Sequence, residues 1–367
     1  MTHQAERFPG QAKYLSSLSR TISLARSQLR TLAARIAGGA GRAAGANGQA
    51  VELGRHILGQ QQMLSYHSLS RLDRSLLLQG RIAAMQVAAR DKIRHLGDVE
   101  FRVCSQWGED GIVEWLCQKL PGINRSFVEF GVENFAEANC RFLIENRGWR
   151  GLVFDGNPEY MKSLREDALY WRHDLTAVNA FITVENINEL IAQGGFAGEL
   201  GILSVDLYGN DYWVLEAIDC VNPAIIILEV NGVFGDLKPL TVPYRPDFHR
   251  LVAHYSGQYF GCSVAAAKLL CARKGYSFLG TNTNGVNAFF VRNDLADPIL
   301  ESLGETRAWA PRHRDSRNRL GELDFVRGLG RYQLVADMPV VDLLTGRLVA
   351  LNELQPLYSD SFMEEFR

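Results

Sequence analysis

Residues 126–134 read SFVEFGVEN, a short apolar and aromatic run that ends in a glycine and polar residues. Similar runs alternate with helical patterns further along the chain. The runs with strand character are SFVEF (126–130), GLVFD (151–155), TAVNAFI (176–182), LGILSVD (200–206) and AIIILEV (224–230). Two more, YSFLGTN and VNAFFVR, flank Asn284-Gly285, a hairpin signal. Apolar strands separated by helices predict a doubly wound, Rossmann-like α/β sheet, here ending in an antiparallel hairpin.

Length and charge divide the chain into regions. Its 367 residues, 47% hydrophobic and 22% charged, fit a globular protein of two domains or of one domain with large additions. Residues 1–100 hold 14 Lys and Arg against 6 Asp and Glu, a net charge of +8, whereas the remainder holds 25 against 35, a net charge of −10. The basic region could contact an acidic partner or the surface of an anionic membrane. The alternative is a solvated helical face.

The N-terminal region, residues 1–100, is predicted to be helical. Residues 13–36 repeat Leu and Ile at helical spacing, and the Gly/Ala-rich residues 37–48 are predicted to be a flexible linker. Residues 51–95 return to a helix, interpreted either as a coiled-coil arm that makes a homo-oligomer or as a helical cap on the next domain. The apolar stripe of this helix comprises Leu58, Leu72, Leu76, Ile82 and Met85.

The predicted sheet domain covers residues 101–295, and residues 296–367 form a C-terminal extension. Beyond residue 300 we expect a poorly defined tail with one hairpin that turns at Thr345-Gly346.

The six cysteines are scattered without a CxxC pair, which excludes zinc-ribbon and thioredoxin-like sites and indicates buried thiols in a reducing compartment. The chain shows neither a signal-peptide pattern nor an apolar run long enough to span a bilayer, so we expect a cytoplasmic protein. The sheet domain is acidic and lacks a basic stripe with interleaved aromatic residues. A nucleic-acid partner is therefore not expected.

Acidic residues lie at the carboxyl ends of four of the five predicted parallel strands. In open α/β sheets, ligands bind at these ends. Clustered carboxylates indicate a ligand, a cation or a proton relay that offsets their repulsion. The acids are Glu129, Asp155, Asp206 and Glu229, and Gly131, Asn134 and Asn231 follow at the same ends.

Two of these acids predict a nucleoside cofactor. Asp155 lies 24 residues after Gly131, close to the spacing of about 20 residues at which a strand-end acid binds ribose hydroxyls. The GVEN turn lacks the GxGxxG fingerprint, and Glu133 would repel a pyrophosphate. S-adenosylmethionine fits, with its ribose on Asp155, its cationic amino-acid portion near Glu129 and its adenine against Phe181. The alternative is that both acids only cap helices.

The motif order SQWGED, VEFGVEN, LVFDGNPE, LSVDLYGNDYW, ILEVN and GVNAFFVR resembles the FkbM-type S-adenosylmethionine-dependent methyltransferases over about residues 100–295. The resemblance implies a class I methyltransferase fold and methylation of hydroxyls on sugars or secondary metabolites. It places Glu129 and Gly131 in the first-strand cofactor motif and Asp155 as the ribose-binding acid. Asp206–Asp211 matches the fourth-strand motif, but Tyr208 stands where relatives often carry a second acid, which leaves the role of that position open.

Residues 105–112, SQWGEDGI, are predicted to begin a short helix over about 109–119. In this fold the helix lies over the cofactor site. Gln106 and Trp107 would then close over the methionine or adenine portion, with Ser105 as a helix cap. The alternative is a capped helix with a buried Trp.

Two chemistries for methyl transfer to a hydroxyl remain open. A divalent cation such as Mg²⁺ or Ca²⁺ could be held by Asp206, Glu229 and Asn231. A general base is the other solution, from His249 or His254 in the long insertion at 232–262, whose aromatic residues suit a sugar.

The predicted function is that of an S-adenosylmethionine-dependent O-methyltransferase acting on a hydroxyl of a sugar, polysaccharide or related metabolite. A nicotinamide-dependent oxidoreductase and a non-catalytic scaffold are the alternatives. Binding of NAD(P), of S-adenosylmethionine or of neither distinguishes the three.

Overall fold

The computed structural model describes residues 44–366. The chain divides into two compact units, and the boundary along the chain lies between Asp73 and Arg74. The described part of the first unit belongs to helix α2 (Ala44–Ala88). The predicted helix at 13–36 and residues 37–43 of the predicted linker lie outside the described residues. Residues 44–48 of that linker are helical, so this part of the prediction is wrong. The run contains no proline, so every residue keeps the N–H that a helix needs, although its two glycines are weak helix formers.

Helix α2 ends earlier than the predicted limit of residue 95, and a short 3-10 turn, η1 (Leu96–Val99), follows. The described residues of the predicted apolar stripe are all exposed, from 44% for Leu76 to 73% for Met85. No described helix is long and apolar enough to cross a membrane. The coiled-coil homo-oligomer and the contact with a membrane surface stay predictions.

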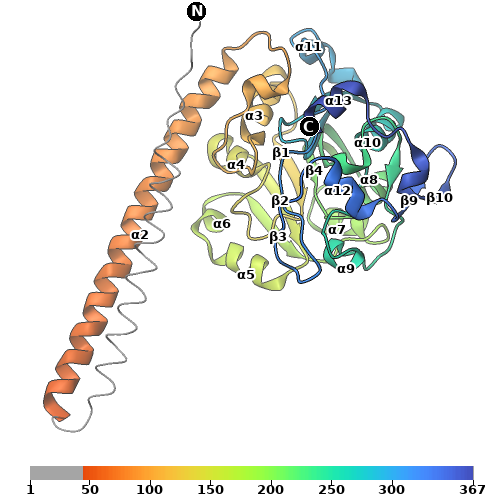
Figure 1. Cartoon of the computed structure of the whole chain (residues 1–367). Coiled ribbons are helices and arrows are strands. Elements are labelled where there is room, and N and C mark those ends of the chain that lie inside the picture. The colour runs from red at the N-terminus through yellow and green to blue at the C-terminus, as the bar shows by residue number, and fades with distance from the viewer. Residues whose placement is uncertain (1–43, 367) are drawn as a thin grey trace, which may run out of the picture. The chain divides into compact units, whose positions relative to one another are not determined.

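The second unit contains a seven-stranded sheet in the order β3-β2-β1-β4-β5-β8-β7. Strands β1 to β4 of this sheet are labelled in Figure 1. All neighbouring pairs from β3 to β5 are parallel, whereas β8 is antiparallel to both of its neighbours. The strands are β1 (Ser126–Phe130), β2 (Arg150–Asp155), β3 (Leu175–Asn179), β4 (Gly198–Val205), β5 (Val221–Glu229), β7 (Tyr276–Thr281) and β8 (Asn287–Arg292). This is the predicted Rossmann-like class I methyltransferase sheet with its antiparallel C-terminal hairpin.

Helices pack on both faces of the sheet because side chains alternate along each buried strand. Phe127 of β1 belongs to one hydrophobic cluster with Ile112 of α3, and the next residue, Val128, belongs to the other cluster with Ile187 of α7. The helices on the first face are α3 (Glu109–Lys119), α4 (Arg141–Arg147), α5 (Pro158–Glu166), α6 (Ala168–Arg172) and α11 (Asp297–Leu300), and those on the second are α7 (Ile187–Gln193), α8 (Asp211–Ala217) and α10 (Val264–Arg273).

Two predicted elements are shorter in the structure. Strand β3 stops at Asn179, opposite Asp155, because β2 ends there and Phe181 has no strand to pair with. The helical pattern AEANCRFLIEN (136–146) between the first two strand runs forms a helix only from Arg141 onward. The buried carboxylate of Glu129 binds the backbone N–H groups of Asn139 and Cys140 and holds the preceding segment as a loop.

The insertion after β5 and the C-terminal extension fold together in the same unit. Strand β6 (Leu240–Thr241) of the insertion pairs with β9 (Pro339–Asp342), which forms the predicted hairpin with β10 (Arg347–Ala350). The expected poorly defined tail is wrong, because Ser316 and Arg331 are 0% and 1% exposed. The other elements are η2 (Gly232–Phe234), α9 (Arg250–Ala253), η3 (Asn293–Leu295), α12 (Leu329–Val335), η4 (Leu351–Leu354) and α13 (Asp360–Phe366).

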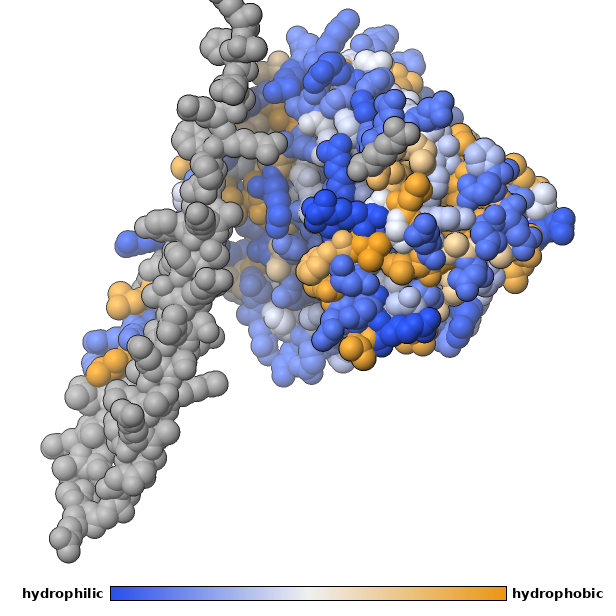
Figure 2. All heavy atoms as spheres, viewed as in Figure 1, coloured by the Kyte–Doolittle hydropathy of each residue, from blue (hydrophilic) through white to orange (hydrophobic). Residues whose placement is uncertain are grey.

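The face of the sheet-containing unit seen in Figure 2 is mostly hydrophilic, with smaller hydrophobic patches between the charged side chains. This surface agrees with the composition of a globular protein, whose apolar residues fill the two clusters beside the sheet.

Candidate functional site

The carboxyl ends of β1 and β4 form the wall of a cavity of about 80 Å³. Four of the predicted site residues line it, namely Gln106, Glu129, Gly131 and Asp206. Lining residues outside the predicted set include Glu133, Asn139, Tyr208 and Asn287. The cavity is smaller than the ~300–1,000 Å³ of typical ligand pockets. It can therefore hold only part of a nucleoside cofactor, and the rest would lie along the open strand ends beside it.

Glu129 lies at the end of β1 and is 3% exposed. Its two carboxylate oxygens accept hydrogen bonds from the backbone N–H groups of Asn139 at 2.7 Å and Cys140 at 3.1 Å. Burial raises the pKa of Glu129 to about 7, and the hydrogen bonds only partly offset this effect. The residue thus anchors the loop before α4 and also presents a carboxyl group to the cavity.

Asp155 ends β2 and is half-buried. One oxygen accepts the N–H of Glu133 at 2.8 Å and the other accepts the N–H of Asn157, the N-cap of α5, at 2.7 Å. A carboxylate offers about four lone-pair positions, so each oxygen retains capacity for a ligand hydroxyl. Asp155 therefore joins the loops after β1 and β2 and keeps acceptors on the same edge. The residue that caps α5 is Asn157, whose side chain accepts the N–H of Glu159.

The other predicted cofactor residues are exposed. Phe181 is 54% exposed, and a Cβ placed on Gly156, next to Asp155, would lie 3.4 Å from its ring. Its face therefore lies beside the β2 end, where a base attached to a ribose on Asp155 would lie. Asn134 does not line the cavity, and its side-chain oxygen accepts the N–H of Ala136 at 3.1 Å within its own loop.

Three acids gather at the ends of β4 and β5. Asp206, Asp211 and Glu229 each offer a carboxylate oxygen within 4.8 Å of the others. Asp211 uses both of its oxygens, which accept the N–H groups of Leu207 at 2.5 Å and Gly209 at 2.9 Å. Asp206 Oδ1 and Glu229 Oε2 are buried and have no hydrogen-bond donor among the described residues.

Burial and mutual repulsion keep these acids partly protonated. Burial, and then the charge of Asp211, raise the pKa of Asp206 to about 7. Burial, and then Asp206, hold the pKa of Glu229 well above its usual range. Because the two carboxyls are buried beside each other and each disfavours the charge of the other, the pair favours holding one proton between them. A shared proton or a bound cation would satisfy the two unpaired oxygens.

Asn231, the third predicted metal ligand, is hydrogen-bonded to backbone groups. Its side-chain oxygen accepts the N–H of Val233 at 3.0 Å, and its amide donates to the carbonyls of Gln258 and Phe260 at 2.9 and 3.0 Å. The oxygen keeps a second lone-pair position, so the role of Asn231 as a ligand stays a prediction. Asp211, which was not among the predicted ligands, lies beside Asp206 and Glu229.

Asn287 of β8 is the site residue that sequence reasoning missed. It lies directly opposite Glu229 in the antiparallel β5–β8 pair and lines the cavity. Its amide donates to Glu109 of α3 at 2.8 Å, while its buried side-chain oxygen has no partner among the described residues. The signal that could have found it is the polar residue near the start of the apolar run VNAFFVR.

Tyr208 lines the cavity with its backbone in the left-handed region, at φ 54°. The bonds from Asp211 to the N–H groups on either side of it hold this conformation. The Arg250 guanidinium lies 4.6 Å from the centre of the Tyr208 ring. The negative charge of Asp206 raises the pKa of the Tyr208 hydroxyl. Non-glycine residues held at positive φ gather at functional sites.

The predicted helix over 109–119 is confirmed as α3. The residue at its N-cap position is Gly108 and not Ser105, but Ser105 Oγ accepts the N–H of Asp110 in the first turn at 3.1 Å. Asp110 Oδ2 accepts the N–H groups of Val103, Cys104 and Ser105, which fixes the segment that carries Gln106 to the cavity.

Neither predicted histidine base lines the cavity. His249 is exposed at the N-cap of α9. His254 Nδ1 lies 2.7 Å from Ser256 Oγ, and burial lowers the pKa of its ring. The group at the cavity with a pKa near neutrality and an oxygen without a donor is Asp206 instead.

A scan against models of known protein families found no match, and no curated protein matched the sequence. Among solved structures, the chain is similar to an O-methyltransferase from Bacillus cereus in complex with SAH, at 14% identity over 59% of this chain and 89% of that one, with a TM-score of 0.35. It is also similar to the N-terminal domain of EvdMO1 with SAH bound, at 14% identity over 49% and 77%, with a TM-score of 0.33. A third is an S-adenosylmethionine-dependent methyltransferase from Clostridium acetobutylicum, at 8% identity over 50% and 90%, with a TM-score of 0.32. These likenesses are distant and do not extend to activity or substrate.

Proposed function

We propose that this protein is an S-adenosylmethionine-dependent O-methyltransferase acting on a hydroxyl of a sugar, polysaccharide or related metabolite. The observation that carries the proposal is the set of acceptor groups at one edge of a class I methyltransferase sheet. Glu129, Asp206 and Asn287 line one cavity, and Asp155 lies at the end of the adjacent strand. This acidic edge suits a cationic nucleoside and repels the phosphates of a dinucleotide.

The residues present fit this cofactor. Asp155 would accept the ribose hydroxyls, Phe181 would pack on the adenine, and Glu129 and the unpaired oxygen of Asn287 would accept donors of the amino-acid portion. When bound, the cofactor supplies an electrophilic methyl group. The acidic edge favours binding of the positively charged cofactor over binding of the product, whose sulfur is uncharged after methyl transfer. The low dielectric around the buried acids strengthens this preference.

Asp206 is the proposed proton acceptor. It lines the cavity, whereas Glu229 lies beside it, is 5% exposed and does not line the cavity. An ionised Asp206 would take the proton of the acceptor hydroxyl as the oxygen attacks. Since burial raises its pKa to about 7, the rate of transfer should rise as the pH passes from 6 to 8.

The predicted divalent cation would use the same two acids. Mg²⁺ held by Asp206 and Glu229 would orient the hydroxyl and lower its pKa instead. If turnover is unchanged by EDTA and by added Mg²⁺, Asp206 acts as the base. If EDTA abolishes turnover and Mg²⁺ restores it, the cation has that role.

Calorimetric titration with S-adenosylhomocysteine tests the cofactor assignment. Asp155→Asn should weaken binding about 10- to 100-fold, since hydrogen bonds to a charged group contribute about 1.5–3 kcal/mol. The control is Asp174→Asn, whose side chain is 70% exposed beside Arg150, and which should bind like the wild type. A folded wild type that binds no S-adenosylhomocysteine refutes the proposal and favours a non-catalytic scaffold. Binding of NAD(P) instead would favour an oxidoreductase.

A further inference from the structure

Four segments that lie far apart in the sequence meet beside the cavity. Gln106 and Tyr208 line it. Trp107, the neighbour of Gln106, has its ring centre 6.4 Å from that of His313 in the C-terminal extension. On the other side, Arg250 of α9 lies 4.6 Å from the ring centre of Tyr208. The cavity-lining residue Tyr208 is therefore in contact with Arg250, and the neighbour of the cavity-lining Gln106 is in contact with His313. Both Arg250 and His313 lie outside the sheet.

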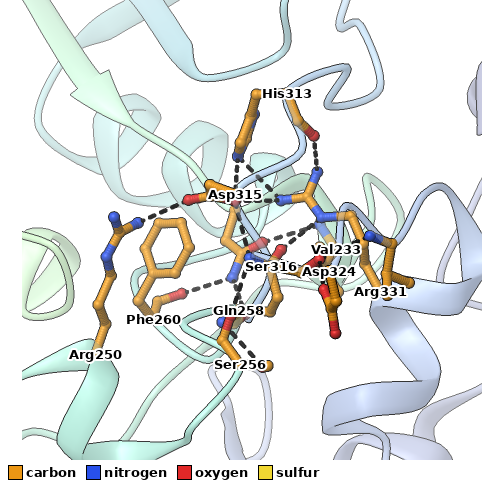
Figure 3. A network of polar contacts seen from close by, with 12 residues as sticks. Val233, Arg250, Ser256, Gln258, Phe260, His313, Asp315, Ser316, Asp324 and Arg331 are labelled. Carbon is orange, nitrogen blue, oxygen red and sulfur yellow. Dashed lines mark hydrogen bonds and ion pairs between the residues drawn. The ribbon is translucent and has the colours of Figure 1, made fainter. Parts of the chain in front are cut away.

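Asp315 joins these two sides (Figure 3). Its Oδ2 lies 3.2 Å from Arg250 Nη1, and its Oδ1 lies 3.5 Å from His313 Nε2 and 3.9 Å from Arg331 Nη2. The contacts thus run without a break from Tyr208 through Arg250, Asp315 and His313 to Trp107. The C-terminal extension supplies the middle of this chain of contacts.

The buried Arg331 determines which ring nitrogen of His313 carries the proton. Arg331 is 1% exposed, and its Nη2 lies 3.0 Å from His313 Nε2. Since an arginine can only donate, Nε2 must accept, and the neutral ring carries its hydrogen on Nδ1. Burial, and then the charge of Arg331, lower the pKa of His313 to about 4, so the ring is neutral at pH 7.

His313 therefore presents an N–H group at Nδ1, and this atom is buried without a hydrogen-bond partner among the described residues. A buried donor without a partner is costly, so a network as ordered as this one points to a ligand atom that accepts from it. The side chains retain access to solvent, at 15% exposure for His313, 26% for Arg250 and 33% for Asp315. Arg250 carries five N–H donors, and its bond to Asp315 at 3.2 Å uses one of them.

We propose that Trp107, Tyr208, Arg250 and His313 form the acceptor subsite of this protein and that the subsite binds a sugar ring. Arg250 covers one face of Tyr208 and His313 packs against Trp107, but both aromatic residues remain partly exposed. Their exposed ring surface suits the C–H groups of a sugar, while His313 Nδ1 and Arg250 suit its hydroxyl oxygens. Asp315 offsets the charge of Arg250, so the subsite does not require an acidic sugar. The assignment rests on the proposed function, because it names the hydroxyl-bearing substrate of the same cavity.

Saturation-transfer NMR on the full chain tests the subsite. The probes are the methyl glycosides of glucose, galactose, mannose and N-acetylglucosamine, each with and without S-adenosylhomocysteine. At least one glycoside should receive saturation from the wild type. His313→Gln keeps an acceptor for Arg331 but removes the Nδ1 donor, and it should weaken that glycoside about 3- to 10-fold. Trp107→Leu removes the aromatic face and should weaken it about 10-fold.

His313→Gln should bind S-adenosylhomocysteine within about twofold of the wild type, because His313 is not among the predicted cofactor residues. The matched control is Trp171→Leu on α6, where the tryptophan is 73% exposed, and it should leave both ligands unaffected. If S-adenosylhomocysteine binds but no glycoside does, or if the two variants bind the glycoside as the wild type does, the subsite is overturned and the proposed function stands. Loss of S-adenosylhomocysteine binding in the wild type instead removes the proposed function itself. If His313→Gln does not fold, Trp107→Leu decides the question.

Discussion

Replacing Glu129 by Gln tests the electrostatics of the site through the stability of the protein. The carboxyl of Glu129 is 3% exposed, and its burial raises its pKa from the ordinary 4.5 to about 7. Between these two values the folded protein holds a proton that the unfolded chain has released. The contribution of this carboxyl to the free energy of unfolding is therefore fully present below pH 4.5 and is lost as the pH rises through 7. A glutamine does not titrate, so the variant lacks this loss.

The size of the effect follows from the same values. The window from 4.5 to about 7 corresponds to about 3 kcal/mol, since each pH unit across it is worth about 1.4 kcal/mol. Glutamine keeps one acceptor but turns its NH2 toward the N–H of Asn139 or Cys140. This mismatch costs about 1–3 kcal/mol at every pH. The variant should thus be less stable than the wild type at pH 4.5 and about equal to it or more stable at pH 8.

Urea unfolding followed by tryptophan fluorescence at pH 4.5, 6, 7 and 8 measures this difference. The control is Glu166→Gln at the end of α5, whose exposed side chain meets water in both states, and whose difference from the wild type should not change with pH. If the free energy of unfolding of Glu129→Gln differs from that of the wild type by the same amount at pH 4.5 and pH 8, the buried-carboxyl argument is refuted.

Two further substitutions test the geometry of the strand ends. Gly131→Ala should lower the free energy of unfolding by well over 2 kcal/mol, because the added Cβ would lie 1.8 Å from the backbone oxygen of Asp206 at a φ of 70°. The control Gly148→Ala, at a φ of 62° with open space around it, should lower it by only about 1 kcal/mol. Equal losses of melting temperature in the two variants would contradict the crowding argument. Asp211→Asn should destabilise the protein by about 1–3 kcal/mol, because the N–H of either Leu207 or Gly209 loses its acceptor. Unchanged unfolding in urea would show that these bonds do not hold the loop.

Elements with a strong local pattern could be predicted from the sequence. The strands begin and end within a few residues of the predicted apolar runs, and helix α3 matches its prediction. The strand-end acids Glu129, Asp155 and Asp206 were also recognisable, because parallel strands that alternate with helices place their carboxyl ends at one edge. Boundaries failed where tertiary contacts compete with local preference, as in the loop that Glu129 holds before α4.

What the sequence by itself determined is the sheet, its antiparallel hairpin and the acidic edge, since each depends on residues close together in the chain. Only the tertiary structure decided which side chains complete the site. The register of β5 against β8 places Asn287 opposite Glu229. Both oxygens of Asp211 and the amide of Asn231 are committed to backbone groups that no motif reveals. The contacts of His313 with Trp107 and of Asp315 with Arg250 arise because the C-terminal extension folds back around the buried Arg331. Such pairings join residues far apart in sequence and depend on packing and burial. The local periodicity of a chain carries no information about them.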